Sequence, residues 1–202
     1  MAIKNIIFDL GGVLLNIDFN KTQKAFADLG VTNFIDLYTQ FHSTPLFVDY
    51  ETGKISDEKF IEGIRSSAGI PLSDENVISA WNALLLDFPI ERLKLLEKLK
   101  TKYRLFLLSN TNALHHAVFQ KTVLDLSGKA FDDYFEKAYY SHSMGMRKPG
   151  VEIYEWVLKQ NNLSAQETLF IDDTLINIEG AKKAGLQAIH LQSPMTILEL
   201  SL

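Results

Sequence analysis

Near its start the chain reads "IIFDLGGVLLNID" at residues 6–18, an apolar run that reaches a carboxylate at Asp9 and then places glycine at positions 11 and 12. An acid at the end of a buried strand is costly unless something at that point uses it. Glycine at the next positions is typical of a backbone that turns tightly or approaches a ligand closely. The stretch therefore predicts a buried strand whose carboxyl end carries a functional acid.

Five short apolar, β-branched or aromatic runs predict strands. Their near-continuous apolar character is expected when both faces of a parallel sheet are covered. Amphipathic helical patterns lie between most of them, and strands that alternate with helices indicate an α/β protein with a Rossmann-like parallel sheet. The predicted strands are residues 3–9, 103–109, 137–141, 168–172 and 187–191, and the clearest helical patterns are at 90–102, 151–162 and 176–185.

The segment between the first two strands is too long for a single crossover. It contains several helical patterns and no strong strand, and Ser56 and Ser73 are each followed by acids, as at the start of a helix. We therefore expect an inserted all-helical subdomain at 16–87, and a core domain made of 1–15 and 88–202. Five aromatic residues should lie in the core of the insertion, unless one or two of them face the substrate instead: Phe41, Phe47, Tyr50, Phe60 and Trp81.

Composition restricts the class of protein. The 202 residues are 47% hydrophobic and 22% charged, which suits one core domain with a modest insertion. A net charge of −5 argues against nucleic acid and anionic membranes as partners, and the absence of cysteine excludes disulfides, thiolate catalysis and thiolate-held zinc. With no long apolar run and no signal-peptide pattern, we expect a cytoplasmic protein, monomeric or homodimeric.

Polar residues follow four of the predicted strands. Open parallel sheets bind ligands beyond the carboxyl ends of their strands. Taken singly, each of these residues has an ordinary explanation as a turn residue, a solvated loop residue or a helix cap. Four strand ends that all carry such groups favour a functional site. The residues are Asp9 after the first strand, Ser109 and Asn110 after the second, Lys148 after the third, and Asp172 and Asp173 after the fourth.

The order D-L-G-G-V at 9–13, S-N at 109–110, K-P at 148–149 and D-D-x-x-x-N at 172–177 resembles the haloacid dehalogenase superfamily of hydrolases, most of which are phosphatases. The resemblance covers essentially the whole chain, and the insertion resembles the helical cap of that superfamily. "FDLGGVLLNIDF" and "FIDDTLINIEGA" are most similar to bacterial sugar phosphatases of the α-glucose-1-phosphate phosphatase kind. The resemblance implies a magnesium-dependent phosphomonoesterase whose substrate is a small soluble phosphate ester, such as a sugar phosphate.

The residue types suit this chemistry. Asp9 can attack phosphorus and form an aspartyl-phosphate, and Lys148 offers a positive charge to Asp9 and the phosphate. Magnesium prefers carboxylate and carbonyl oxygens, which Asp9 and Asp173 supply, with Asp172 completing the cluster directly or through water. By the resemblance, the carbonyl of Gly11 is a further ligand.

Groups that could hold the phosphate oxygens follow the first and second predicted strands. They are the Ser109 hydroxyl and the backbone N–H groups near Leu10, Gly11 and Asn110. Backbone N–H groups at helix N-termini commonly bind phosphate in this way. Asn177 either orients Lys148 or the acidic loop, or simply occupies the first turn of its helix.

Gly11 departs from the pattern. Phosphatases of this superfamily usually have a second aspartate there as general acid and base, and such proton transfer commonly contributes about 10²–10⁴-fold. A good leaving group or a water would cover part of this loss. Asp18 is a candidate substitute, or else a polar residue of the linker to the cap.

Two other functions remain open. The 2-haloacid dehalogenases also lack the second aspartate, but carbon–halogen displacement needs no magnesium, so the acidic pair at 172–173 favours the phosphatase. Alternatively, the glycine marks a low-turnover protein that binds a phosphate ligand or a partner.

Overall fold

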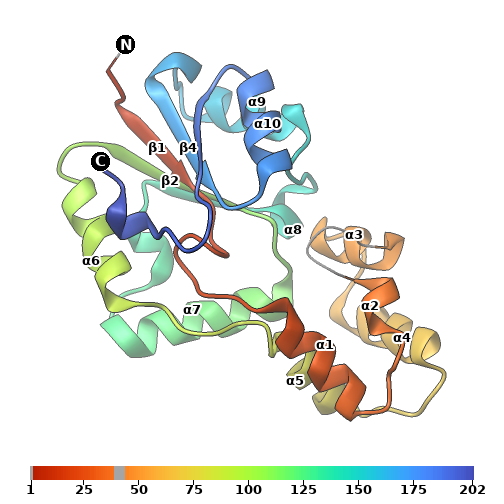
Figure 1. The fold of residues 1–202 in the computed structure, drawn as a ribbon. Helices are drawn as coiled ribbons and strands as arrows, with labels where there is room; N and C mark the ends of the chain where they lie inside the picture. Colours follow the sequence, from red (N-terminus) through yellow and green to blue (C-terminus); the bar gives the residue numbers. More distant parts are fainter. Residues whose placement is uncertain (1, 39–43) are drawn as a thin grey trace.

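The computed structural model describes residues 2–38 and 44–202, and a parallel sheet of five strands lies at its centre (Figure 1). The strands lie in the order β3-β2-β1-β4-β5, and every neighbouring pair is parallel. The predicted α/β fold is confirmed, and each predicted strand is present with ends that differ by at most two residues. The strands are β1 (Asn5–Phe8), β2 (Arg104–Ser109), β3 (Lys137–Tyr140), β4 (Thr168–Asp172) and β5 (Gln187–His190).

Two helical layers cover the sheet. On one face α6 (Ile90–Leu99) and α7 (Ala113–Ser127) pack against alternate strand residues such as Ile6 and Phe8. On the other face α9 (Val151–Gln160) and α10 (Leu175–Lys183) pack against Ile7. Because successive strand side chains point to opposite faces, covering both faces requires an apolar residue at nearly every position. This is why the strand sequences lack an alternating pattern.

Helices α1 to α5 follow β1 and form a separate body (Figure 1). Ser56 and Ser73 accept hydrogen bonds from the third N–H of their helices, so the predicted helix starts are confirmed. Phe47, Tyr50, Phe60 and Trp81 are buried together in a cluster of their own, as predicted, whereas Phe41 lies outside the described residues. The helices are α1 (Phe19–Asp28), α2 (Phe34–Leu37), α3 (Pro45–Glu51), α4 (Asp57–Ala68) and α5 (Asp74–Asn82).

The chain enters and leaves this body along one path. The N–H of Asn16 donates to the carbonyl of Asp87, and Ile17 forms a bridge with Leu85. The shorter elements of the core complete the fold. They are α8 (Ser141–Met144) and the 3₁₀ turns Phe131–Tyr134, Ala165–Glu167 and Ile197–Glu199. None of the helices in the described ranges has the length and hydropathy of a membrane span.

The register of the sheet brings the functional strand ends together. Phe8 of β1 lies opposite Leu107 of β2 and Ile171 of β4. The next residue, Asp9, donates its N–H to the carbonyl of Ile171 over 2.9 Å. Asp9 therefore lies at the centre of the edge where β1, β2 and β4 all end.

Candidate active site

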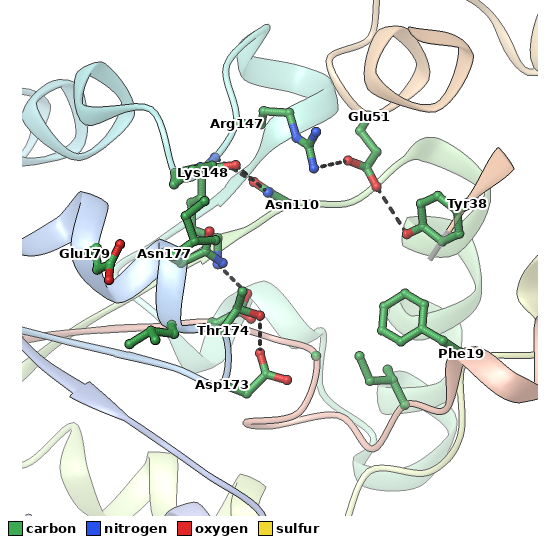
Figure 2. Close-up of a pocket in the computed structure, with 16 residues that line it drawn as sticks. Phe19, Tyr38, Glu51, Asn110, Arg147, Lys148, Asp173, Thr174, Asn177 and Glu179 are labelled. Carbon is green, nitrogen blue, oxygen red and sulfur yellow. Dashed lines mark hydrogen bonds and ion pairs between the residues drawn. The ribbon is translucent and has the colours of Figure 1, made fainter. Parts of the chain in front are cut away.

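A cavity of about 600 Å³ opens at this edge, between the sheet and helices α1 to α3 (Figure 2). Its wall is built from both parts of the chain. The core contributes Asp9, Gly11, Asn110, Arg147, Lys148, Pro149, Asp173, Thr174, Leu175, Ile176, Asn177 and Glu179, and the segment after β1 contributes Ile17, Phe19, Tyr38 and Glu51.

Lys148 joins two of the predicted acids. Its Nζ lies 2.7 Å from Asp9 Oδ1 and 2.6 Å from Asp172 Oδ2. The side chains of Lys148 and Asp172 are 1% and 0% exposed, so neither charge is solvated by water. Burial lowers the pKa of Lys148, but the two carboxylates raise it by more, and the ammonium group stays charged. The lysine is therefore fixed as a positive charge directly beside Asp9.

Asp172 acts as the anchor of this group. Asn177 Nδ2 donates to both of its carboxylate oxygens, over 3.2 and 3.1 Å, and the N–H of Thr174 donates to Oδ1 over 2.8 Å. Both oxygens of Asp172 are thus engaged before any ligand arrives. Of the two readings of Asn177, its hydrogen bonds favour the one in which it orients the acidic loop.

Asp173 borders the cavity and is held at one oxygen. Its Oδ1 accepts a hydrogen bond from Thr174 Oγ1 over 3.0 Å, and its carbonyl lies 2.9 Å from His190 Nε2. Gly12 has a φ of +72°, and a Cβ at that position would overlap the Asp173 carboxylate. The second glycine of the opening stretch thus permits both the turn and the close approach of the acid.

Three carboxylates with a single lysine suit a divalent cation. One oxygen from each of Asp9, Asp172 and Asp173 lies within 4.8 Å of the others. Burial and the charge of Asp172 raise the pKa of both Asp9 and Asp173, because the negative charges are incompletely compensated. Hard oxygen donors with excess negative charge are the ligands that magnesium prefers.

Backbone donors surround the same point. In residues 2–38 and 44–202, the N–H groups of Leu10, Gly11 and Asn110 have no hydrogen-bond acceptor. The Leu10 side chain is buried in the sheet core, whereas Gly11 and Asn110 border the cavity. Main-chain N–H groups that lack an acceptor commonly receive phosphate oxygens.

The side chains of Ser109 and Asn110 have other surroundings. Asn110 Nδ2 donates to the carbonyl of Lys148 and its Oδ1 accepts from the N–H of Lys148, both over 2.9 Å, so the amide fixes the lysine backbone. Ser109 is buried, its Oγ lies 3.4 Å from the Asn110 carbonyl, and it is not part of the cavity wall. Contact between the Ser109 hydroxyl and a phosphate therefore stays a prediction.

Asp18 has a structural role. It is the N-cap of α1, its carboxylate accepts the N–H of Asn20 over 2.9 Å, and its own N–H donates to the carbonyl of Leu84. It is not part of the cavity wall, although its neighbours Ile17 and Phe19 are. Of the two readings of Asp18, the structure favours the linker residue over the substitute acid.

A second polar group, which the sequence did not reveal, lies in the cavity wall on the side of α3. Arg147 Nη2 lies 2.9 Å from Glu51 Oε2, and the hydroxyl of Tyr38 donates to Glu51 Oε1 over 3.4 Å (Figure 2). Arg147 directly precedes the K-P motif at 148–149, which is the one signal that the sequence gives for it. Glu51, the last residue of α3, lies near no motif.

Known proteins are similar to this chain in sequence and in fold. A family model described as haloacid dehalogenase-like hydrolase matches residues 3–185. A D-ribitol-5-phosphate phosphatase of Bacteroides thetaiotaomicron is 33% identical over 188 residues, which cover 93% of this chain and 91% of that enzyme. A sesquiterpene phosphatase of Aspergillus oryzae is 30% identical, and the match covers 98% of this chain and 95% of the relative. A crystal structure of a haloacid dehalogenase family enzyme of B. thetaiotaomicron, with magnesium and inorganic phosphate, has a TM-score of 0.91, 36% identity and full coverage of both chains.

Proposed function

We propose that this chain, which belongs to the haloacid dehalogenase-like hydrolase family, is a magnesium-dependent phosphomonoesterase that acts on a small soluble phosphate ester. The observation that carries the proposal is the arrangement around Asp9: a fixed lysine, a second cavity-facing carboxylate on Asp173 and three backbone N–H groups that have no acceptor among the described residues. Two relatives that are named phosphatases and a similar structure that holds magnesium and phosphate support it.

In the proposed first step a carboxylate oxygen of Asp9 attacks phosphorus. The bond from phosphorus to the ester oxygen breaks, its electron pair leaves on that oxygen, and an aspartyl-phosphate forms. In the second step a water attacks the phosphorus of this intermediate and gives a proton to solvent, which balances the proton that the leaving alkoxide takes from solvent in the first step. The bond to Asp9 breaks, inorganic phosphate leaves, and the carboxylate is restored.

Lys148 and the backbone position the phosphoryl group in both steps. The ammonium group of Lys148 is beside Asp9 and compensates negative charge on the transferred oxygens. The N–H groups of Leu10, Gly11 and Asn110 would donate to the same oxygens. Asp9, Asp173 and the carbonyl of Gly11 would hold magnesium, with Asp172 behind them. When bound, the ion would neutralise charge between the carboxylates and the phosphate.

The leaving oxygen receives no proton from residue 11, because glycine has no acidic group. The reaction should therefore favour esters whose alcohol is a good leaving group, or which take a proton from water. Sugar phosphates, and above all sugar 1-phosphates, meet this condition better than simple alkyl phosphates. We also propose that residues 16–87 act as a cap that selects the substrate, while 1–15 and 88–202 perform the chemistry.

The test is phosphate release from a panel of small phosphomonoesters, measured with magnesium and with EDTA. We expect turnover of sugar or polyol phosphates and of p-nitrophenyl phosphate with magnesium, and none with EDTA. Tight ligand binding without phosphate release would favour the low-turnover binding protein. Halide release from 2-haloacids in the presence of EDTA would favour the dehalogenase.

A further inference from the structure

Glu51, Arg147 and Tyr38 bring an ion pair between a buried glutamate and a half-buried arginine to the cavity wall contributed by α3, away from the acids that would hold the metal (Figure 2). Glu51 comes from α3 and Arg147 from the loop before Lys148, so the pair forms only where the insertion meets the core. Lys148, Asp9 and Asp172 already account for phosphate chemistry, and nothing in that chemistry requires this second pair.

The pair is incompletely satisfied. Glu51 is 5% exposed, and burial raises its pKa while Arg147 lowers it. Within the described part of the chain, the buried Nε of Arg147 has no hydrogen-bond partner, and Glu51 Oε2 meets only the guanidinium group. Buried polar atoms without partners are rare in folded proteins, because each costs desolvation free energy. Both residues line the cavity, so a ligand that brings a donor and an acceptor would satisfy these two atoms once the side chains shift toward it.

The charge of the cavity limits what this ligand can be. The positive charge of Arg147 is compensated by Glu51, and the wall also carries Asp9, Asp173 and the exposed Glu179. A second anionic group on the substrate would therefore be repelled. A hydrocarbon chain would cover the pair and leave its open donor and acceptor unpaired. A hydroxyl group both donates and accepts, carries no charge, and fits the pair.

Apolar side chains complete this side of the wall. Phe19 lies beside Tyr38, with ring centroids 5.9 Å apart, and Ile17 borders the same cavity. Pockets that combine an apolar wall with a few fixed polar groups orient a small molecule through those groups. Here the C–H groups of a carbon chain would contact Phe19 and Ile17, while its hydroxyls face Glu51 and Arg147.

We propose that Glu51, Arg147 and Tyr38 form the subsite that binds hydroxyl groups of the substrate alcohol, so that the enzyme selects phosphate esters of neutral polyols or sugars. Glu51 accepts a hydrogen bond from a substrate hydroxyl, Arg147 Nε–H donates to a substrate oxygen, and Tyr38 orients Glu51. This inference rests on the proposed phosphatase function, which it deepens by assigning the class of alcohol and the residues that recognise it.

The test compares two esters that differ only in hydroxyl groups, a pentitol 5-phosphate and n-pentyl phosphate. For Glu51→Gln we expect kcat/KM for the pentitol ester to fall by about 10- to 100-fold, as for loss of a charge-assisted hydrogen bond, and that for the pentyl ester to change by less than about threefold. Tyr38→Phe, which removes only a hydroxyl, should reduce the ratio of kcat/KM for the pentitol ester to kcat/KM for the pentyl ester by a smaller factor. Each ester serves as its own reference, so their different intrinsic reactivities cancel.

Asp49→Asn is the matched control. Asp49 lies on the same helix and pairs with Lys54 at the surface, 3.3 Å away, so its loss changes the same charge without touching the pair. A third ester, a pentonic acid 5-phosphate, adds a terminal carboxylate. The wild type should hydrolyse it more slowly than the pentitol ester, and Glu51→Gln should narrow this difference.

Two results would overturn the subsite, and a third would overturn the proposed function on which it rests. A parallel fall for the pentitol and pentyl esters would show that the pair only holds the insertion on the core. Unchanged ratios in both Glu51→Gln and Tyr38→Phe would show that hydroxyls are recognised elsewhere. Failure of the wild type to release phosphate from any ester, p-nitrophenyl phosphate included, would remove the proposed function itself. That failure is read in the wild type alone, so it is distinguishable from failure of the subsite.

Discussion

The two groups of charges in the cavity wall are built in different ways. Around Asp9, the acids lie at or just after the ends of the neighbouring strands β1 and β4, and Lys148, from the loop between α8 and α9, is held between Asp9 and Asp172 by two ion pairs that leave it little freedom. Around Glu51, the groups come from a helix of the insertion and a loop of the core, and two buried polar atoms lack a hydrogen-bond partner within the described residues.

This difference separates chemistry from selection. A sheet ladder fixes the residues that follow its strands, so a reaction centre built there keeps its geometry when distant residues change. The group at Glu51 depends on how the insertion packs on the core. Its side chains can be substituted without a shift in the position of Asp9 or Lys148. Substitutions in the first group should therefore affect every ester alike, whereas those in the second should affect only some.

The largest effect is expected for Asp9→Asn. Asparagine is nearly isosteric, so the fold should persist, but its amide cannot attack phosphorus, and the turnover of every ester should fall by at least about 10⁴-fold. Phosphate release in steady state is the measurement. Asp18→Asn, in the same opening stretch, is the control, because asparagine caps a helix as well as aspartate does. A near wild-type rate for Asp9→Asn would exclude the covalent mechanism.

Metal dependence should be the next largest effect. Asp173→Ala removes a carboxylate that faces the cavity, and the magnesium concentration for half-maximal activity should rise by about 100-fold or more. Magnesium should also raise the Tm of the wild type and have little effect on that of the variant, because a ligand of the folded state stabilises it. Glu51→Gln should leave both readouts unchanged. Full activity in EDTA would contradict a metal-dependent site.

The third prediction concerns stability, and its expected effect is smaller than the two effects on activity. It involves His115, a residue of α7 that packs against the insertion. Its ring stacks on Trp81 with centroids 4.6 Å apart, and its Nε2 lies 3.1 Å from the Trp81 carbonyl. Burial lowers the pKa of His115 to about 4. The unfolded chain, with a pKa of about 6.5, therefore binds more protons between these values, and stability is lost as the pH falls through this window.

For His115 this linkage amounts to about 2 kcal/mol between pH 7 and pH 5. Urea unfolding of the wild type and of His115→Gln at both pH values isolates the contribution, since the other titrating groups are common to both proteins. The wild type should lose more stability than the variant over this interval. Equal losses would mean that folding does not lower the pKa of His115.

Sequence patterns predicted the strand-end group because they act locally. The predicted strands of Asp9, Ser109 and Asp172 end on these polar residues, and parallel pairing brings them to one edge, so the sequence alone could place them. Lys148 lies in the loop after its strand and was assigned through the K-P motif of the resemblance. The family resemblance supplied the expected roles, and the family itself is confirmed by the match over residues 3–185. The α/β fold, which the structure confirms, was also predictable from local patterns. Strands that are covered on both faces are apolar at nearly every position, and such runs are visible in the sequence.

The group at Glu51 was not predictable in this way. Glu51 and Arg147 are separated by nearly half of the chain, and no periodic pattern connects a helix of the insertion to the loop before Lys148. The use of Asn110 was equally hidden, since its amide binds the backbone of Lys148 and only its N–H is left for a ligand. Contacts of this kind depend on tertiary packing, which local propensity does not encode.

The smallest expected effect concerns Gly11, where the chain departs from the usual phosphatase pattern. If no residue protonates the leaving oxygen, rates should rise steeply with leaving-group acidity, so that p-nitrophenyl phosphate, acetyl phosphate and sugar 1-phosphates outpace simple alkyl phosphates. Gly11→Asp should reduce the spread of rates, that is, the ratio between the rates for good and for poor leaving groups, by about tenfold. The reason is that a carboxylic acid then protonates the poorer leaving groups. A series of esters of graded acidity is the measurement.

The geometry at Gly11 makes the substitution feasible and supplies its controls. Gly11 does not have a positive φ, and a Cβ there would lie 2.8 Å from Ile17 Cδ1, the flexible end of a side chain. Ile17→Val in the same protein makes room for the acid, and Gly11→Asn has the same size without the proton. The asparagine variant should keep the wild-type spread, so that any narrowing in Gly11→Asp reports proton transfer rather than crowding. A flat dependence in the wild type, with chemistry rate-limiting, would show that another group already protonates the leaving oxygen, and loss of activity in Asp18→Asn would then identify it.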